Sequence, residues 1–155
     1  MGIFEFLRRP PPQQHPQFGS LDYAGGRWRG TIELERGARI TLLLPGTRGG
    51  PRPDGVQLAE TAPSTWTQVR SVVEAGLYAH YSAVHDAGLS DLPPIASSRE
   101  VWRHVTLSSV EIHPHRRRDE LLVAIRSAWD DEHTLGALVR DGTLVELNGS
   151  ILETR

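Results

Sequence analysis

The stretch "RWRGTIELERGARITLLLP" (residues 27–45) decides the fold, because hydrophobic and polar residues alternate along its first half. One parity holds Trp28, Gly30, Ile32 and Leu34, and the other holds Arg27, Arg29, Thr31 and Glu33. A period of two predicts a β-strand with one wet face. Arg36-Gly37 indicates a turn, and "ARITLLLP" predicts a more deeply buried strand that ends at Pro45.

Upstream of this hairpin, "FGSLDYAGG" (18–26) predicts a further strand, which the Gly25-Gly26 turn joins to the next one. Residues 18–45 are therefore expected to form a three-stranded antiparallel meander. The segment before it, "RRPPPQQHPQ" (8–17), is proline-rich and polar, which favours an extended arm without packed structure. We expect residues 1–17 to be a flexible N-terminal arm and residues 18–155 to be a single α+β domain.

Downstream, a loop and then a long helix are expected. The composition of "GTRGGPRPDG" (46–55) favours a mobile surface loop, and the lysine of a phosphate-binding loop is missing from it. Pro63 suits the first turn of a helix, and Thr65 with Gln68 could form a capping box. An apolar stripe at spacings of three and four follows. It consists of Trp66, Val69, Val73, Leu77, Tyr81 and Val84. Gly88 is the expected C-cap residue.

The last third of the chain returns to strands. Ser97 and Glu100 indicate a second capping box before a short helix, "REVWRHV". Residues 105–113 and 120–129 read as extended, and Asp141-Gly142 predicts a type I′ turn in a final hairpin. The expected order is β-β-β-α-(α)-β-β-β-β. This order predicts an α+β fold in which one long helix packs across an antiparallel sheet.

Composition narrows the functional classes. The chain has 155 residues and no cysteine, which excludes disulfides, a thiol nucleophile and Cys-ligated metal sites. All 17 basic residues are arginine, so a Schiff-base lysine is excluded too. The net charge of −2 lacks the basic excess typical of general nucleic-acid binders. No apolar run is long enough to span a bilayer, and in "MGIFEFLRR" the arginines follow the apolar part, unlike in a signal peptide. We expect a cytoplasmic protein with no membrane, nucleic-acid or cofactor partner.

The stretch "SAWDDEHTLG" (127–136) gathers Asp130, Asp131, Glu132 and His133. Because it lies between two expected strands, we interpret it first as a polar hairpin connection, in which acidic side chains hydrogen-bond the backbone. Trp129 would then anchor the connection in the core. The alternative is a metal or acid/base site that uses His133 with Glu132 or Asp130.

A second polar cluster follows the strand at 105–113. His113 and His115 lie two residues apart, a spacing that can ligate zinc or nickel, with His133 as a further candidate ligand. Arg116, Arg117 and Arg118 would repel a cation but could grip an acidic partner or a phosphate group. A solvated loop is the favoured interpretation.

The aromatic residues and the remaining histidines are expected to be mainly structural. The four tryptophans should be mostly core residues, although tryptophan also favours binding hot spots. Trp28, between Arg27 and Arg29, is the one with the local pattern of an RNA-stacking residue, but strand alternation explains it better. His80 and His85 lie on the expected helix and are expected to be structural.

Several short signals occur in a fixed order: "FGSLDY", "RWRGTIEL", "ITLLLP", a helical middle, and "WDDEHTLGALVRDGTLVEL". This order resembles a family of uncharacterised bacterial domains that carry F-G-x-L, W-x-G and a late W-D-x-E-H-x-L-G followed by D-G. Some members resemble immunity proteins that neutralise toxins. The resemblance covers residues 18 to about 148. In the late motif it matches Trp129, Asp130, Glu132, His133 and Gly136, whereas Asp131 is at a variable position.

Two functional hypotheses remain. The resemblance and the lack of catalytic motifs favour a non-enzymatic domain that binds a protein partner, possibly a toxin, through a face of the sheet and its loops. Trp129, Asp130, Glu132, His133 and the three arginines of 116–118 are the candidate binding residues. The alternative is a small metal-dependent or acid/base enzyme that uses the cluster from Asp130 to His133.

Overall fold

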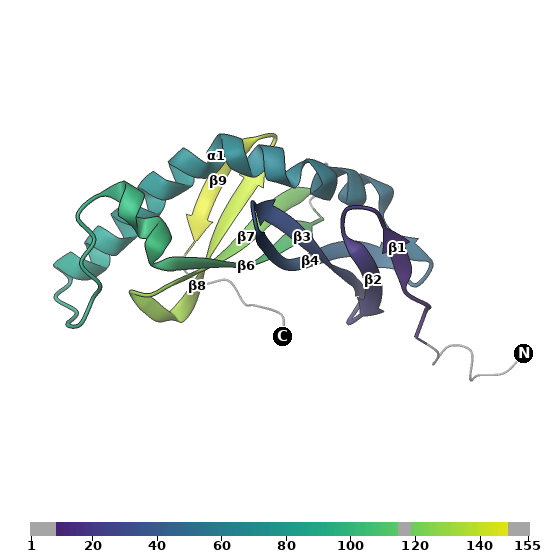
Figure 1. Cartoon of the computed structure of the whole chain (residues 1–155), viewed down its shortest axis with the longest axis horizontal. Coiled ribbons are helices and arrows are strands. Elements are labelled where there is room, and N and C mark those ends of the chain that lie inside the picture. Colours follow the sequence, from purple (N-terminus) through teal and green to yellow (C-terminus); the bar gives the residue numbers. More distant parts are fainter. Residues whose placement is uncertain (1–8, 115–118, 149–155) are drawn as a thin grey trace, which may run out of the picture.

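The computed structural model describes residues 9–114 and 119–148, in which a long helix lies across one face of a β-sheet (Figure 1). The helices are α1 (Pro53–Asp86) and the 3₁₀ helix η2 (Ser98–Arg103). The strands are β1 (Gln13–His15), β2 (Gly19–Ala24), β3 (Arg27–Glu35), β4 (Ala38–Thr47), β5 (Gly50–Pro51), β6 (Val105–His113), β7 (Glu120–Ser127), β8 (Asp130–Arg140) and β9 (Thr143–Asn148).

The sheet has the order β1-β2-β3-β4-β6-β7-β8-β9, and β5 pairs with β4. β4 and β6 are parallel, whereas the other neighbours among the described strands are antiparallel. The parallel pair follows from the connection, because α1 and η2 lie between these two strands in the sequence and a parallel neighbour needs such a crossover. The predicted α+β fold, with a long helix on a mainly antiparallel sheet, is confirmed.

The core lies between α1 and the face of the sheet that the alternating residues of β3 predict to be dry. Trp28 and Ile32 are fully buried there, and Trp28 lies opposite Leu44 across the β3–β4 pair. The predicted apolar stripe of the helix is confirmed as well. Its buried members are Trp66, Val69, Val73, Leu77 and Tyr81. Full burial of one large apolar side chain is worth about 1.5–3 kcal/mol, so this interface dominates the stability of the fold.

Helix α1 begins ten residues earlier than the sequence predicts. Its first-turn proline is Pro53, after Arg52 in an extended conformation, and Pro63 lies inside the helix. The predicted capping box of Thr65 and Gln68 is therefore wrong, because both residues lie within α1. An interior proline removes one helical hydrogen bond. The helix nevertheless continues through Pro63, and Ala59 and Ala62 on the preceding turn are fully buried in the core.

The predicted mobile loop at 46–55 is wrong in most of its length. β4 continues past Pro45 to Thr47, a tight turn leads into β5, and α1 starts at Pro53. The turn is closely packed at Gly46, where a Cβ atom would lie 2.4 Å from the carbonyl oxygen of Gly50. Glycine at this position thus allows two backbone segments to pack closely. From composition alone, the same glycines indicate a flexible loop.

Part of the proline-rich segment is structured, contrary to the expectation for residues 8–17. Gln13–His15 form β1 and pair antiparallel with β2, and His15 stacks on Phe18 with ring centroids 4.3 Å apart. Short edge strands flanked by proline are common because proline blocks further pairing. The division at residue 17 into an arm and a domain stays a prediction, and residues 1–8 lie outside the described residues.

The predicted strands and turns of the last third are largely confirmed. β6 spans the predicted residues, and Asp141 and Gly142 have φ angles of 49° and 74°, as a type I′ turn requires. β7 ends at Ser127, two residues earlier than predicted. The short helix is 3₁₀, and the predicted capping box is wrong: the Ser97 side chain makes no capping hydrogen bond, and Glu100 accepts from the backbone N–H of Ala96 at 2.8 Å, not from that of Ser97.

Each of the four tryptophans donates its indole N–H to a different residue. The pairs are Trp28 to the Thr47 carbonyl (2.9 Å), Trp66 to Glu35 (2.9 Å), Trp102 to Glu74 (2.7 Å) and Trp129 to His80 Nδ1 (3.0 Å). Trp28, Trp66 and Trp129 are buried, as predicted for core residues, and Trp102 is half-buried. The RNA-stacking interpretation of Trp28 is wrong, because its side chain is fully buried.

A polar network fastens β3 and η2 to α1 around Trp66 and Trp102. Glu35 accepts hydrogen bonds from Trp66 and from Arg70 Nε, both at 2.9 Å. The Arg70 guanidinium lies 3.9 Å from the centroid of the Trp102 ring, which is a cation–π contact. On the other side of that ring system, the hydrogen bond from Trp102 lowers the pKa of Glu74. This network spans residues far apart in the sequence, so no local pattern predicts it.

Candidate functional site

The acidic stretch at 130–133 opens strand β8 and does not form the tight turn itself. Ala128 and Trp129 form the turn, and the pairing register then shifts from Ser127–Asp130 to Arg126–Thr134. Residues 131–133 are therefore accommodated in a bulge. Asp130 Oδ1 accepts hydrogen bonds from the backbone N–H of His133 (3.2 Å) and lies 2.9 Å from its ring Nδ1. The predicted backbone hydrogen bond of an acidic side chain is thus confirmed for Asp130.

The Asp130–His133 pair stands on the surface. The hydrogen bond and charge of Asp130 raise the pKa of His133, and Glu132 adds a smaller effect. The His133 side chain is 49% exposed and that of Asp130 is 18% exposed. Because Asp130 occupies Nδ1, Nε2 is the nitrogen that His133 offers to another group. The pair can therefore present a positively charged or hydrogen-bonding imidazole in a fixed orientation.

Trp129 anchors this turn in the core, as predicted. Its side chain is only 4% exposed. Its ring makes an edge-on contact with Tyr81, with centroids 5.6 Å apart, and its N–H bonds to His80. His80 thus has a structural role, which agrees with the expectation from the sequence.

The structure does not bring His113 together with the cluster from Asp130 to His133. His113 ends β6 opposite Glu120, the first residue of β7, whereas Asp130 pairs with Ser127 at the other end of β7. His115 and the arginines 116–118 lie outside the described residues. Within 9–114 and 119–148, no group of three or more His, Cys, Asp or Glu side chains is placed to hold a metal ion.

A continuous row of cross-strand neighbours crosses the sheet on the face opposite α1, which we call the open face. The row runs Arg29, Leu43, Glu111, Leu122, Leu138 and Glu146, each directly opposite the next. Leu43 is only 7% exposed, although it does not belong to the core between α1 and the sheet. Leu122 and Leu138 are half-buried. The row therefore combines three leucines with charged residues at both ends and with Glu111 between Leu43 and Leu122.

Ion pairs border the apolar part of this row. Arg27 pairs with Glu111, and Glu120 pairs with Arg140, whose Nε donates to the carboxylate at 2.7 Å. The Glu111 and Glu120 side chains are only 12% and 8% exposed. Paired charges at such low exposure hold their side chains in fixed positions. The sequence places Arg27 on the wet face of its strand, but Glu111, Glu120 and Arg140 were missed, because their pairing depends on strand order.

His113 belongs to the same corner of the open face. Its Nε2 lies 3.1 Å from Glu111 Oε1 and is buried, yet it makes no hydrogen bond there. Burial and the nearby Arg27 charge lower the pKa of His113, and Glu120 opposes this effect. His113 is therefore a neutral group next to the ion pairs at neutral pH.

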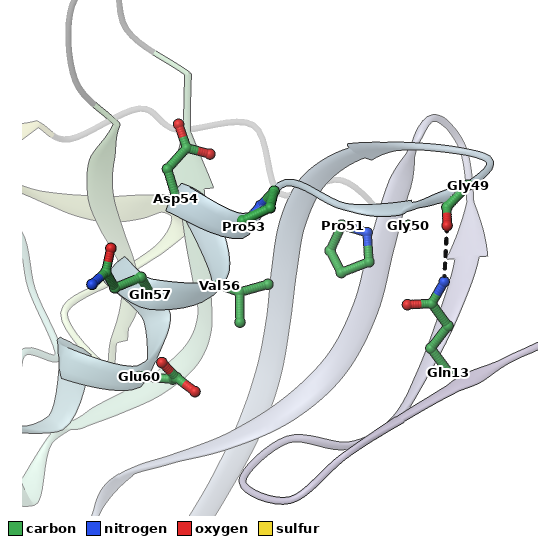
Figure 2. Close-up of a pocket in the computed structure, with 9 residues that line it drawn as sticks. All are labelled: Gln13, Gly49, Gly50, Pro51, Pro53, Asp54, Val56, Gln57 and Glu60. Atoms are coloured by element: carbon green, nitrogen blue, oxygen red, sulfur yellow. Dashed lines mark hydrogen bonds between the residues drawn. The ribbon is translucent and has the colours of Figure 1, made fainter.

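A shallow groove of about 640 Å³ lies between β1, the β4–β5 turn and the first turns of α1 (Figure 2). Its size falls in the range of small-molecule sites. Its charged groups are already engaged, however. Asp54 pairs with Arg52, which lowers the pKa of Asp54, and Glu60 lies 3.4 Å from the Nε2 atom of His15. Figure 2 shows Gln13 bonded to the Gly49 carbonyl across one end of the groove.

Within the described part of the chain, no helix combines the length and apolar character required to cross a membrane. Comparisons with curated proteins and with solved structures found no match. The sequence model of one family, described as a domain of unknown function (DUF6985), matches residues 17–151. Because this match covers most of the sequence, the chain belongs to the DUF6985 family.

Proposed function

We propose that this chain is a protein-binding domain that contacts its partner through the open face of the sheet. The observation that carries the proposal is the row across that face, in which Leu43, Leu122 and Leu138 lie among the charged residues Arg29, Glu111 and Glu146. Protein interfaces typically combine apolar side chains with polar and charged ones. Among the described residues, helix α1 packs on the opposite face of the sheet, and on the open face Leu122 and Leu138 are half-buried whereas Leu43 is 7% exposed.

The ion pairs beside the row support the proposal in a second way. Binding costs conformational entropy for each side chain that becomes fixed, about 0.5–1.5 kcal/mol per flexible side chain. Arg27 and Arg140 are already held by Glu111 and Glu120 before any partner arrives. A surface with such pre-ordered side chains loses less conformational entropy on binding than a surface with free arginines.

A finer proposal is that the partner is a toxin and that the chain is a bacterial immunity protein. This proposal rests on the resemblance of the late motif around Trp129, Asp130 and His133. The three arginines of 116–118 lie outside the described residues, and they stay predicted binding residues. No specific observation favours the alternative of a metal-dependent or acid/base enzyme.

The test uses a toxin-like protein encoded next to the gene of this chain. The purified pair is titrated by isothermal calorimetry, and bacterial growth is measured with the toxin expressed alone and together with the chain. We expect a dissociation constant of about 1 μM or tighter, which corresponds to about 8 kcal/mol, and restored growth. Absence of binding at that concentration contradicts the binding proposal. Binding without restored growth contradicts only the immunity proposal.

A further inference from the structure

We propose that the hydrogen bond between Trp129 and His80 is a proton-sensitive latch that holds the β7–β8 turn on helix α1. The latch is closed while His80 is neutral and opens when its imidazole takes up a second proton. This inference goes beyond the proposed function, and it holds whether or not the open face binds a partner.

The direction of the hydrogen bond follows from the chemistry of the two rings. An indole N–H can only donate, so His80 Nδ1, 3.0 Å away, must accept with its lone pair. The ring proton of neutral His80 therefore lies on Nε2. In the charged imidazolium both ring nitrogens carry protons, so two donors would face each other and the bond would be lost.

The position of Trp129 makes this bond structurally important. Trp129 belongs to the two-residue turn between β7 and β8, and it is only 4% exposed to solvent. His80 and Tyr81 are adjacent on α1, and both rings contact the Trp129 ring, with centroids 6.5 and 5.6 Å away. Among the backbone hydrogen bonds of the described residues, one other joins this turn to a neighbouring segment: Ala128 N–H donates to the His104 carbonyl at 2.8 Å. Loss of the latch would thus loosen the turn, which the Tyr81 ring contact and the Ala128 hydrogen bond still hold, while the β7–β8 ladder stays paired.

Titratable groups surround His80 on two sides. On α1, Tyr81 follows it directly, and His85 contacts the Tyr81 ring with centroids 5.9 Å apart. On the turn side, Ala128 N–H donates to the carbonyl of His104, and Asp130 and His133 follow Trp129 in the sequence. Within the described ranges, His80 forms no ion pair with a carboxylate or an arginine.

The Asp130–His133 pair responds to acid in the opposite sense. Protonation strengthens its contact, because a charged imidazole faces the Asp130 carboxylate. Acid would therefore loosen the turn from α1 and at the same time tighten the bulge that follows it. The two effects are separable, since they depend on different histidines.

The other three tryptophans provide internal controls. Trp28 donates to a backbone carbonyl, and Trp66 and Trp102 donate to carboxylates. A carbonyl does not titrate, and a carboxylate that accepts hydrogen bonds stays ionised well below neutral pH. Among the four indole N–H groups, only that of Trp129 has an acceptor whose lone pair is lost when a histidine is protonated.

The experiment follows the four indole N–H signals of the full chain, labelled with nitrogen-15, in two-dimensional NMR spectra between about pH 8 and about pH 5. The Trp129 signal is assigned with the Trp129→Phe variant. We expect it alone to shift when the sample is acidified, and its exchange with solvent to rise by about tenfold more than that of the other three. In His80→Gln, where an amide oxygen keeps an acceptor in place, the Trp129 signal should no longer titrate.

Two outcomes overturn the proposal. The first is a Trp129 signal in the wild-type chain that does not move with pH, a result that needs no variant. The second is a Trp129 titration that persists unchanged in His80→Gln. Asp130→Asn serves as the control for the neighbouring pair: it should alter the titration of His133 and leave that of the Trp129 signal in place.

Discussion

Replacement of Glu35 by alanine should destabilise the fold by about 2 kcal/mol, mainly through Trp66 on the helix. Glu35 is the acceptor for the indole N–H of Trp66, a side chain that is only 1% exposed. A buried donor left without an acceptor costs about 1–3 kcal/mol. Arg70 loses its ion pair as well, but because this pair is about one-third exposed it adds only about 0–1 kcal/mol.

The assay is urea unfolding followed by tryptophan fluorescence and by circular dichroism, and the expected loss corresponds to a fall of about 4–8 °C in Tm. Glu35→Gln is the matched control, because its amide oxygen still accepts the hydrogen bond from Trp66 and should keep most of the stability. In a Trp66→Phe background, Glu35→Ala should cost at least about 1 kcal/mol less than in the wild type. A Glu35→Ala loss below about 0.5 kcal/mol, or an equal loss in both backgrounds, would refute this reasoning.

Three further predictions concern the turn at β4–β5 and the two histidines of the polar clusters. Gly46→Ala should cost about 2–4 kcal/mol or prevent folding, because its Cβ would lie 2.4 Å from a backbone oxygen of Gly50; urea unfolding measures this, and a neutral substitution would contradict the close packing. The NMR titration midpoint of His133 should lie above that of an unperturbed histidine, and it should fall in Asp130→Asn. Because the pKa of His133 is raised in the folded state, its pair with Asp130 stabilises the fold at low pH. This contribution is lost as the pH rises through the folded-state pKa. For His113 the folded-state pKa is lowered, so stability should decline as pH falls below about 6.5, and His113→Gln should remove this part of the pH dependence; an unchanged slope would show that another group causes it.

The sequence predicts the fold well where one local period decides the structure. The alternation from Trp28 to Leu34 identifies β3 and its buried face, and the stripe from Trp66 to Tyr81 identifies α1. Asp141-Gly142 defines a hairpin because only a few residue types adopt two consecutive positive φ angles. In each case the signal lies within one element.

The errors arise where local signals favour one structure and tertiary packing favours another. Pro63 indicates a helix start, but α1 continues through it, and Ala59 and Ala62 on the preceding turn are buried in the core. The glycines and prolines of 46–55 indicate a mobile loop, but Gly46 allows a tightly packed turn. Gln13–His15 have no strand signal of their own, and they become β1 because an edge of β2 is available.

The candidate site was predicted only in its local part. Trp129 as an anchor and Asp130 as a backbone acceptor follow from the sequence of the turn. The open face does not, because its row joins residues from six strands and requires the order β3-β4-β6-β7-β8-β9. Likewise His80, the partner of Trp129, lies 49 residues away in the sequence.

The most direct test of the proposed function is the affinity of the purified chain for the toxin-like protein encoded beside it, compared between Leu122→Asp and Val72→Asp. Leu122 lies at the centre of the open face, whereas Val72 is 56% exposed on α1 and provides a matched apolar-to-acidic control. Both variants are first checked for wild-type circular dichroism. We predict that Leu122→Asp weakens binding by at least about tenfold, or about 1.4 kcal/mol, and that Val72→Asp leaves it unchanged. Equal affinities for the wild type and Leu122→Asp would contradict the assignment of the open face as the binding surface.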